Sequence, residues 1–158
     1  MNPSLESLVA NLKLKTPFSE IDPAHHKVLE AFLLGEQRYR EQAKIKWLLR
    51  TSGLKPVKTF AQFDWTFNPK IPKDDILAFA HSPWIDQARN LVLIGDVGIG
   101  KSHIVSALCY EAILKGVDTL FITAFDLVSK IKRALHPENK IDYFSRIGVL
   151  ALDELGYT

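Results

Sequence analysis

The chain has 158 residues, of which 47% are hydrophobic and 24% are charged, and its net charge is +2 at pH 7. This balance is ordinary for a globular protein and excludes a compositionally disordered chain. The single cysteine, Cys109, excludes an intramolecular disulfide and a multi-cysteine zinc site, and neither a signal peptide nor an apolar run of membrane-spanning length is visible, so we expect a cytoplasmic protein.

Residues 1–53 are predicted to form a helical N-terminal region. A first helix is indicated by leucines at helical spacing, namely Leu5, Leu8 and Leu12. A longer helical pattern runs from about Ala24 to Arg50. Asp22 before Pro23 gives this helix a start signal, and Gly53 is a natural left-handed stop.

The end of this region is basic. Residues 36–58 hold seven basic side chains against two acidic ones, a local charge of +5. This asymmetry favours a polyanionic partner, either DNA or an acidic protein, while a merely solvated helix face is the alternative. Trp47 and Tyr39 could stack on bases there, although burial is more common. The candidate DNA contacts are Arg38, Arg40, Lys44, Lys46 and Arg50.

Residues 54–75 contain three prolines and four aromatic residues. The prolines argue against a regular element, and the aromatic residues argue against a flexible linker. We therefore predict an ordered connector that packs against the following domain. A short helix from about Asp74 to Ala80 should follow it.

Residues 76–158 are predicted to form part of an α/β domain. Three short apolar segments indicate buried strands, Leu91–Ile94, Asp118–Thr123 and Ile147–Leu152. Two helices should separate them, Lys101–Lys115 and Phe125–Leu135, the second stopped near Pro137. Apolar strands that alternate with helices of this length predict a parallel sheet covered on both faces.

The segment from residue 95 to residue 102 matches G-x-x-x-x-G-K-[ST] in full, which predicts a phosphate-binding P-loop. Its glycines let successive N–H groups turn inward around phosphate oxygens, and the following helix adds its positive N-terminal end. Lys101 would reach the β- and γ-phosphates of ATP, and the Ser102 hydroxyl would coordinate Mg²⁺. The alternative is a glycine-rich turn with a solvated lysine. The candidate nucleotide-binding residues are Gly95, Asp96, Val97, Gly98, Ile99, Gly100, Lys101, Ser102 and His103.

The third apolar segment ends in two carboxylates, Asp153 and Glu154. Asp153 would hold Mg²⁺ together with Ser102, and Glu154 would act as general base on the attacking water, with Lys101 stabilising the phosphates. Two acids after a strand are alternatively a simple helix N-cap. The distance of 52 residues from Lys101, with one strand–helix unit between, favours the catalytic interpretation.

Several phrases together resemble the IstB-type transposition helper ATPases, which are related to the DnaC helicase loaders within the AAA+ group. They are Lys101-Ser102-His103, Thr123-Ala124-Phe125-Asp126-Leu127-Val128 and Leu152-Asp153-Glu154-Leu155-Gly156-Tyr157, together with the aromatic connector that begins at Lys58-Thr59-Phe60. The resemblance covers nearly the whole chain. It implies a P-loop AAA+ parallel sheet and ATP- and Mg²⁺-dependent assembly on DNA beside a transposase, with self-association of the full-length form.

The resemblance also implies a departure. Family members continue beyond the Asp153-Glu154 phrase with two more strands, a polar sensor residue and an arginine finger. With a strand order of 5-1-4-3-2, strands one and three of this chain would lack the strand that lies between them, so each would present unpaired backbone groups. We therefore expect a truncated, hydrolysis-deficient ATPase acting in transposition. The alternatives are a DnaC-like replicative helicase loader and a non-catalytic fragment that binds DNA or a partner.

Overall fold

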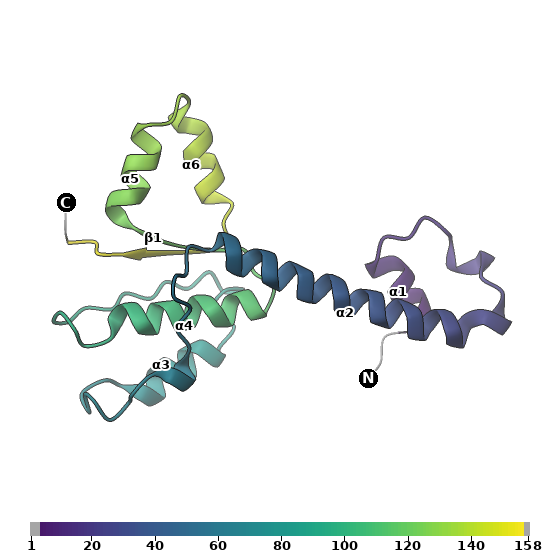
Figure 1. Ribbon diagram of the computed structural model, residues 1–158, viewed down its shortest axis with the longest axis horizontal. Coiled ribbons are helices and arrows are strands. Elements are labelled where there is room, and N and C mark those ends of the chain that lie inside the picture. Colours follow the sequence, from purple (N-terminus) through teal and green to yellow (C-terminus); the bar gives the residue numbers. More distant parts are fainter. Residues whose placement is uncertain (1–3, 157–158) are drawn as a thin grey trace. The chain divides into compact units, whose positions relative to one another are not determined.

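The computed structural model describes residues 4–156 and has an α/β architecture. The chain divides into two compact units, unit 1 (Met1–Lys46) and unit 2 (Trp47–Thr158). No helix in the described range is both long and apolar enough to cross a membrane. In chain order the α-helices and strands are α1 (Leu5–Asn11), α2 (His26–Thr51), α3 (Lys73–His81), α4 (Lys101–Leu114), β1 (Thr119–Thr123), α5 (Ala124–Lys132), α6 (Pro137–Ser145) and β2 (Val149–Asp153) (Figure 1).

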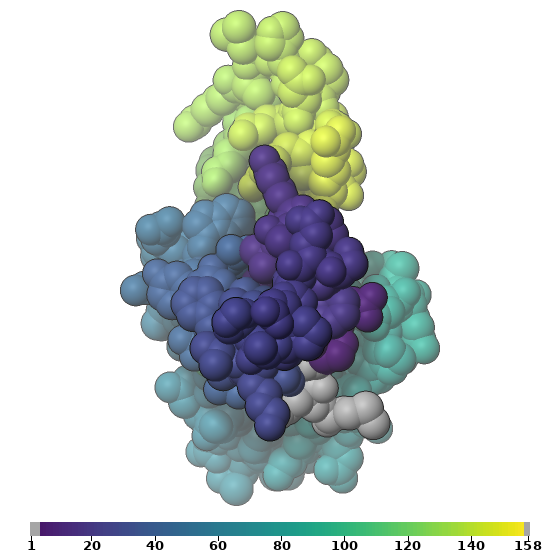
Figure 2. Space-filling view, turned by 90° about the vertical axis from the view of Figure 1, so that its right-hand side faces the viewer, coloured from purple at the N-terminus to yellow at the C-terminus, as the bar shows by residue number. Residues whose placement is uncertain are grey.

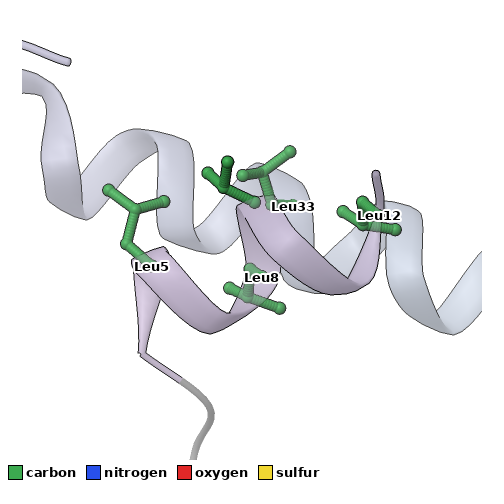
Figure 3. Packing of buried hydrophobic residues seen from close by; sticks show 5 residues of the cluster. Leu5, Leu8, Leu12 and Leu33 are labelled. Carbon is green, nitrogen blue, oxygen red and sulfur yellow. The ribbon is translucent and has the colours of Figure 1, made fainter. Parts of the chain in front are cut away.

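Unit 1 is built around the leucines that predicted its first helix. The hydroxyl oxygen of Ser4 caps α1 by accepting a hydrogen bond from the N–H of Ser7 at 3.3 Å. The buried side chains of α1 and of the chain just after it meet Leu33 of α2, as Figure 3 shows for Leu5, Leu8 and Leu12. Each fully buried leucine removes enough apolar surface from water to contribute about 1.5–3 kcal/mol, so this small cluster holds the unit together.

The long helix α2 confirms the predicted helix from about Ala24 to Arg50. The Asp22 carboxylate accepts a hydrogen bond from the N–H of Ala24 at 2.8 Å, and a short 3-10 turn over Pro23–His25 leads into the helix. At the other end Gly53 has φ of +79°, the left-handed conformation expected of the stop.

The sheet consists of two parallel strands. β1 and β2 pair in register, with Thr119 opposite Val149 and Thr123 opposite Asp153. The two strands are therefore neighbours, as the order 5-1-4-3-2 requires of strands two and three. In Figure 1 the α5–α6 hairpin and α4 lie on opposite sides of this sheet, and Figure 2 shows the hairpin as a separate green-to-yellow lobe of unit 2.

The predicted strand at Leu91–Ile94 is wrong. The structure leaves this segment outside any strand or helix, and the side chains of Val92 and Ile94 are 70% and 91% exposed. A strand exists through the hydrogen bonds of a neighbour, and in residues 4–156 no other segment pairs with this one. An apolar run alone cannot supply that neighbour.

The second helix of the α/β region is shorter than predicted, and a further helix follows it. The prediction of a helix over Phe125–Leu135 gives way to α5, which ends at Lys132. Pro137, taken only as a stop, also begins α6 as its first residue. Proline suits the first turn of a helix because its missing N–H has no intrahelical partner there.

The connector is ordered and packs against the following helices, as predicted. Its aromatic residues Phe60, Phe63 and Trp65 pack against a buried cluster from α3 and α4 that includes Ile76 and Ile104. The rings of Phe63 and Trp65 are 4.6 Å apart between centroids. Aromatic pairs at such distances add about 0.5–1.5 kcal/mol beyond the area they bury, so the connector is a structural part of unit 2.

Candidate nucleotide-binding site

The P-loop segment turns directly into α4. Gly98 and Gly100 have φ of +84° and +96°, a region that residues with a side chain rarely adopt. Gly100 is the N-cap of α4 and offers no side chain to its first-turn amides. The first α4 amide that donates to a main-chain carbonyl in the described structure is that of Ile104, to Gly100 at 3.0 Å. The amides of residues 101–103 therefore remain available to an anion.

The ammonium of Lys101 lies against the loop that precedes it. Its Nζ donates to the carbonyl oxygens of Gly95 and Asp96, both at 2.7 Å. The loop thus closes around the lysine, which brings the charge and the free amides of α4 to one place. A triphosphate fits this arrangement, since its oxygens can replace the two carbonyls as acceptors from Lys101.

Ser102 and Asp153 line the same small pocket, although they lie far apart in the sequence. The pocket has a volume of ≈ 140 Å³. Its other lining residues are Leu54, Lys55, Pro56, Lys58, Ser106 and Phe121. One hydroxyl and one carboxylate suit Mg²⁺, which keeps several waters and takes few protein ligands when phosphates are present. In accord with that, residues 4–156 contain no cluster of three metal-ligating side chains.

Glu154 stands apart from this pocket. Its side chain is exposed and is not among the lining residues. Its φ of +57° is left-handed, which is strained for a residue with a side chain, and its N–H donates to the carboxylate of Asp153 at 3.0 Å. The structure therefore places Asp153, but not Glu154, beside Ser102.

A larger pocket of ≈ 600 Å³ lies beside the loop on the side of Lys101. Most of its wall is apolar, with Ile76 and Phe79 of α3 facing Leu93 and Ile99. Its size and apolar lining suit an organic ligand of moderate size. No sequence pattern pointed to this pocket, because its walls come from α3 and from the unpaired segment before the P-loop.

His103 is held by the connector and lines neither pocket. Its Nε2 lies 2.9 Å from the carbonyl oxygen of Thr59, and its ring meets that of Phe63 edge to face at 5.0 Å between centroids. Phe63 in turn lies against Gly100, where an added Cβ would meet the ring Cε2 at 2.7 Å. The geometry gives His103 and Phe63 the task of positioning the loop.

Three of the other predicted nucleotide contacts, Asp96, Val97 and Gly98, lie on the exposed part of the loop, and the side chain of Val97 is 84% exposed. Side-chain exposure does not count against them, because in such a loop the backbone N–H groups do the binding.

The basic residues of α2 are exposed, but they do not form one patch. Arg40 is engaged within unit 1, since its Nε pairs with Glu36 at 2.5 Å and its Nη1 donates to the carbonyl of Leu12 at 3.1 Å. The other four candidates are exposed without an ion pair in the described structure, namely Arg38, Lys44, Lys46 and Arg50. Trp47 and Tyr39, for which burial was the more common outcome, are 50% and 69% exposed.

Three contributors to the site were missed at the level of sequence. Lys55 and Lys58 counted only toward the basic stretch, and Phe63 only toward the aromatic connector. Their nearness to the P-loop arises from contacts such as that of the Lys58 N–H with the Ser106 hydroxyl at 3.3 Å. The two residues are 48 positions apart, so no local pattern could reveal the contact.

Known proteins were compared with the chain as a whole. Residues 4–158 match the family described as "IstB-like ATP binding protein". The chain is 36% identical over 129 residues to an ATP-binding protein of insertion sequence IS5376 from Geobacillus stearothermophilus, covering 79% of this chain and 51% of the relative. It is 31% identical over 121 residues to the corresponding protein of insertion sequence IS232 from Bacillus thuringiensis, covering 75% and 48%.

A more distant similarity links the chain to the replicative helicase loader DnaC of Escherichia coli, with 31% identity over 72 residues that cover 42% of this chain and 29% of the relative. The chain spans about half the length of the two insertion-sequence relatives. Because the family match extends over nearly every residue, from the first helix through the P-loop to the paired acids, the chain belongs to the IstB-like ATP-binding protein family.

Proposed function

We propose that this chain binds ATP with Mg²⁺ and that it belongs to an ATP-dependent helper of DNA transposition that acts with a transposase on DNA. The observation that carries the proposal is the convergence of four features at the start of α4. They are the left-handed glycines, the free first-turn amides, the Lys101 ammonium, and the pocket shared by Ser102 and Asp153. The names of the insertion-sequence relatives support the biological setting.

Each residue has a distinct task in this proposal. The amides of residues 98–103 donate hydrogen bonds to phosphate oxygens, and Lys101 exchanges the carbonyls of Gly95 and Asp96 for those oxygens. Ser102 and Asp153 hold Mg²⁺ directly or through water. Bound magnesium neutralises charge on the phosphates. The apolar pocket beside Lys101 accommodates the nucleoside part.

Glu154 is the proposed general base, but we expect turnover by this chain alone to be slow. Its carboxylate is exposed and lies outside the pocket of Ser102 and Asp153. A general base must come within hydrogen-bond reach of the water it activates. Binding of ATP, and not its hydrolysis, is therefore the activity to measure first.

The experiment is a titration of the chain with a fluorescent ATP analogue in the presence of magnesium. We expect Lys101→Ala to weaken ATP binding by about tenfold or more, because a charge-assisted contact to phosphate contributes about 1.5–3 kcal/mol. Lys115→Ala is the matched control, since Lys115 is an exposed lysine just beyond the other end of the same helix. Equal affinities for the wild type and Lys101→Ala would remove the nucleotide-site proposal.

Contact with DNA is the second part of the proposal, and it rests on the exposed cations of α2. Each phosphate contact releases counterions, so retention of duplex DNA should fall steeply as salt rises. Replacing Arg38, Lys44 and Lys46 together by alanine should weaken retention and flatten the salt dependence. Arg40→Ala should be tested separately, because Arg40 also holds the carbonyl of Leu12. Retention that is absent, or that ignores salt, would leave α2 as a solvated surface.

The helicase-loader alternative differs in the partner protein. The DnaC similarity spans 42% of this chain, whereas the insertion-sequence relative from Geobacillus spans 79%. We therefore prefer the transposase as partner. Co-purification of the chain with the transposase and with a replicative helicase, run in parallel, separates the two.

A further inference from the structure

We propose that Lys58 of the connector is a second phosphate-binding lysine, which contacts the terminal phosphate of the bound nucleotide. The inference rests on the proposed ATP binding and adds to it a residue outside the P-loop. Lys58 lines the ≈ 140 Å³ pocket together with Ser102 and Asp153. A cation placed there lies beside the two residues proposed to hold Mg²⁺, where the phosphate end of the nucleotide carries most of its negative charge.

The backbone of Lys58 is fixed to α4. Its N–H donates to the Ser106 hydroxyl at 3.3 Å, one turn along the helix from Ser102. The next residue is fixed as well, because the carbonyl oxygen of Thr59 lies 2.9 Å from the Nε2 of His103. Thr59 also forms a capping box with Gln62, which makes this part of the connector rigid. Lys58 therefore begins from a defined place on the pocket wall.

The charge of Lys58 is not committed elsewhere in the described structure. Neither Lys55 nor Lys58 forms an ion pair within residues 4–156, even though Asp153 lines the same pocket. Lys58 is half-buried, and the apolar side chains of Leu54 and Phe121 form part of the wall around it. A cation beside such a wall interacts more strongly with phosphate than one in open water.

Lys55 is the natural comparison. It lines the same pocket with the same charge, but it is exposed, and no hydrogen bond of its backbone to α4 is present in the described structure. Because holding a free lysine side chain in one place costs conformational entropy, the anchored and half-buried residue should contribute more to binding. The proposal therefore assigns the role to Lys58.

The test compares ATP and ADP binding, both with magnesium, for the wild type, Lys58→Ala, Lys58→Arg, Lys55→Ala and Lys101→Ala. Lys58→Ala keeps the backbone N–H that reaches Ser106, and its melting curve checks that the fold survives. We expect Lys58→Ala to weaken ATP binding about five- to tenfold while changing ADP binding less than about twofold. Lys58→Arg should stay close to the wild type, and Lys55→Ala should have less than about half the effect on a logarithmic scale.

Equal loss of ATP and ADP affinity in Lys58→Ala, no loss of either, or an ATP-selective loss of the same size in Lys55→Ala overturns the proposal. Duplex DNA retention is measured on the same variants, and a loss there without a change in ATP affinity also overturns it, because the phosphate would then be that of DNA. If Lys101→Ala abolishes binding while Lys58→Ala has no ATP-selective effect, nucleotide binding stands and only the role of Lys58 falls. If the wild type binds neither nucleotide, both proposals fall.

Discussion

The ring of Phe63 closes off the space beside Gly100. A Cβ at residue 100 would lie 2.7 Å from Cε2 and 2.9 Å from Cζ of that ring, and Gly100 itself has φ of +96°. The connector and the P-loop are thus in van der Waals contact at the residue that caps α4. This contact ties the shape of the phosphate loop to a segment that begins nearly forty residues before it.

Gly100→Ala should both destabilise the protein and weaken ATP binding. The left-handed φ costs an alanine about 1–2 kcal/mol, and the clash with Phe63 adds to this cost. Gly35→Ala is the control, since nothing lies within 4 Å of its added Cβ and alanine is favoured within a helix. The free energy of unfolding from urea titration, measured beside ATP affinity, checks the prediction. A Gly100→Ala variant as stable as the wild type would show that the Phe63 contact is not close.

Gly53→Ala should be among the most destabilising glycine substitutions in unit 2. Gly53 has φ of +79°, and its added Cβ would lie 2.4 Å from the carbonyl oxygen of Phe121, a backbone atom of β1 that cannot swing aside. We expect a loss of more than about 2 kcal/mol. Gly98→Ala has a similar φ of +84° but open space around the Cβ, so it isolates the cost of the backbone conformation alone. Equal thermal shifts in the two variants would contradict the role assigned to the Phe121 contact.

Leu8→Ala should loosen unit 1. Leu8 is 0% exposed in the cluster between α1 and α2, and removing a buried leucine side chain costs about 2–5 kcal/mol. Hydrogen exchange at the amides of α1 should accelerate strongly in this variant. Leu14→Ala, at a position that is 41% exposed, should leave those amides close to their wild-type protection. Unchanged exchange in Leu8→Ala would mean that the cluster does not stabilise the unit.

Cys109 should resist alkylation in the folded protein. Burial raises the pKa of its thiol to about 12 from an ordinary value of 9.0, so the reactive thiolate is scarce at pH 8. Iodoacetamide should label Cys109 slowly until denaturant is added, as mass spectrometry can follow. Rapid labelling without denaturant would indicate that α4 opens readily.

The same burial predicts a pH dependence of stability. Above about pH 9 the unfolded chain loses the thiol proton while the folded chain keeps it. The free energy of unfolding should therefore decline as the pH rises from 9 toward 12, and Cys109→Ala should lack this contribution to the decline. Urea titrations of the two proteins at pH 8 and pH 10 provide the comparison.

Local signals in the sequence determined much of this protein. Asp22, Pro23 and Gly53 mark the limits of α2, because capping and left-handed stops depend on residues adjacent in the chain. The P-loop pattern, the helix that follows it and the adjacency of the two strands before and after α5 and α6 were likewise predictable. Pro137 showed the limit of such signals, since one residue can end one helix and begin the next.

Tertiary structure alone decided the rest. Leu91–Ile94 has the composition of a strand but none of the hydrogen bonds, because a strand needs a neighbour that composition cannot provide. The meeting of Ser102 with Asp153, and of both with Lys58, depends on how the connector and β2 pack against α4. Contacts between residues some fifty positions apart are set by packing of the whole unit, and no periodicity or motif in one segment records them.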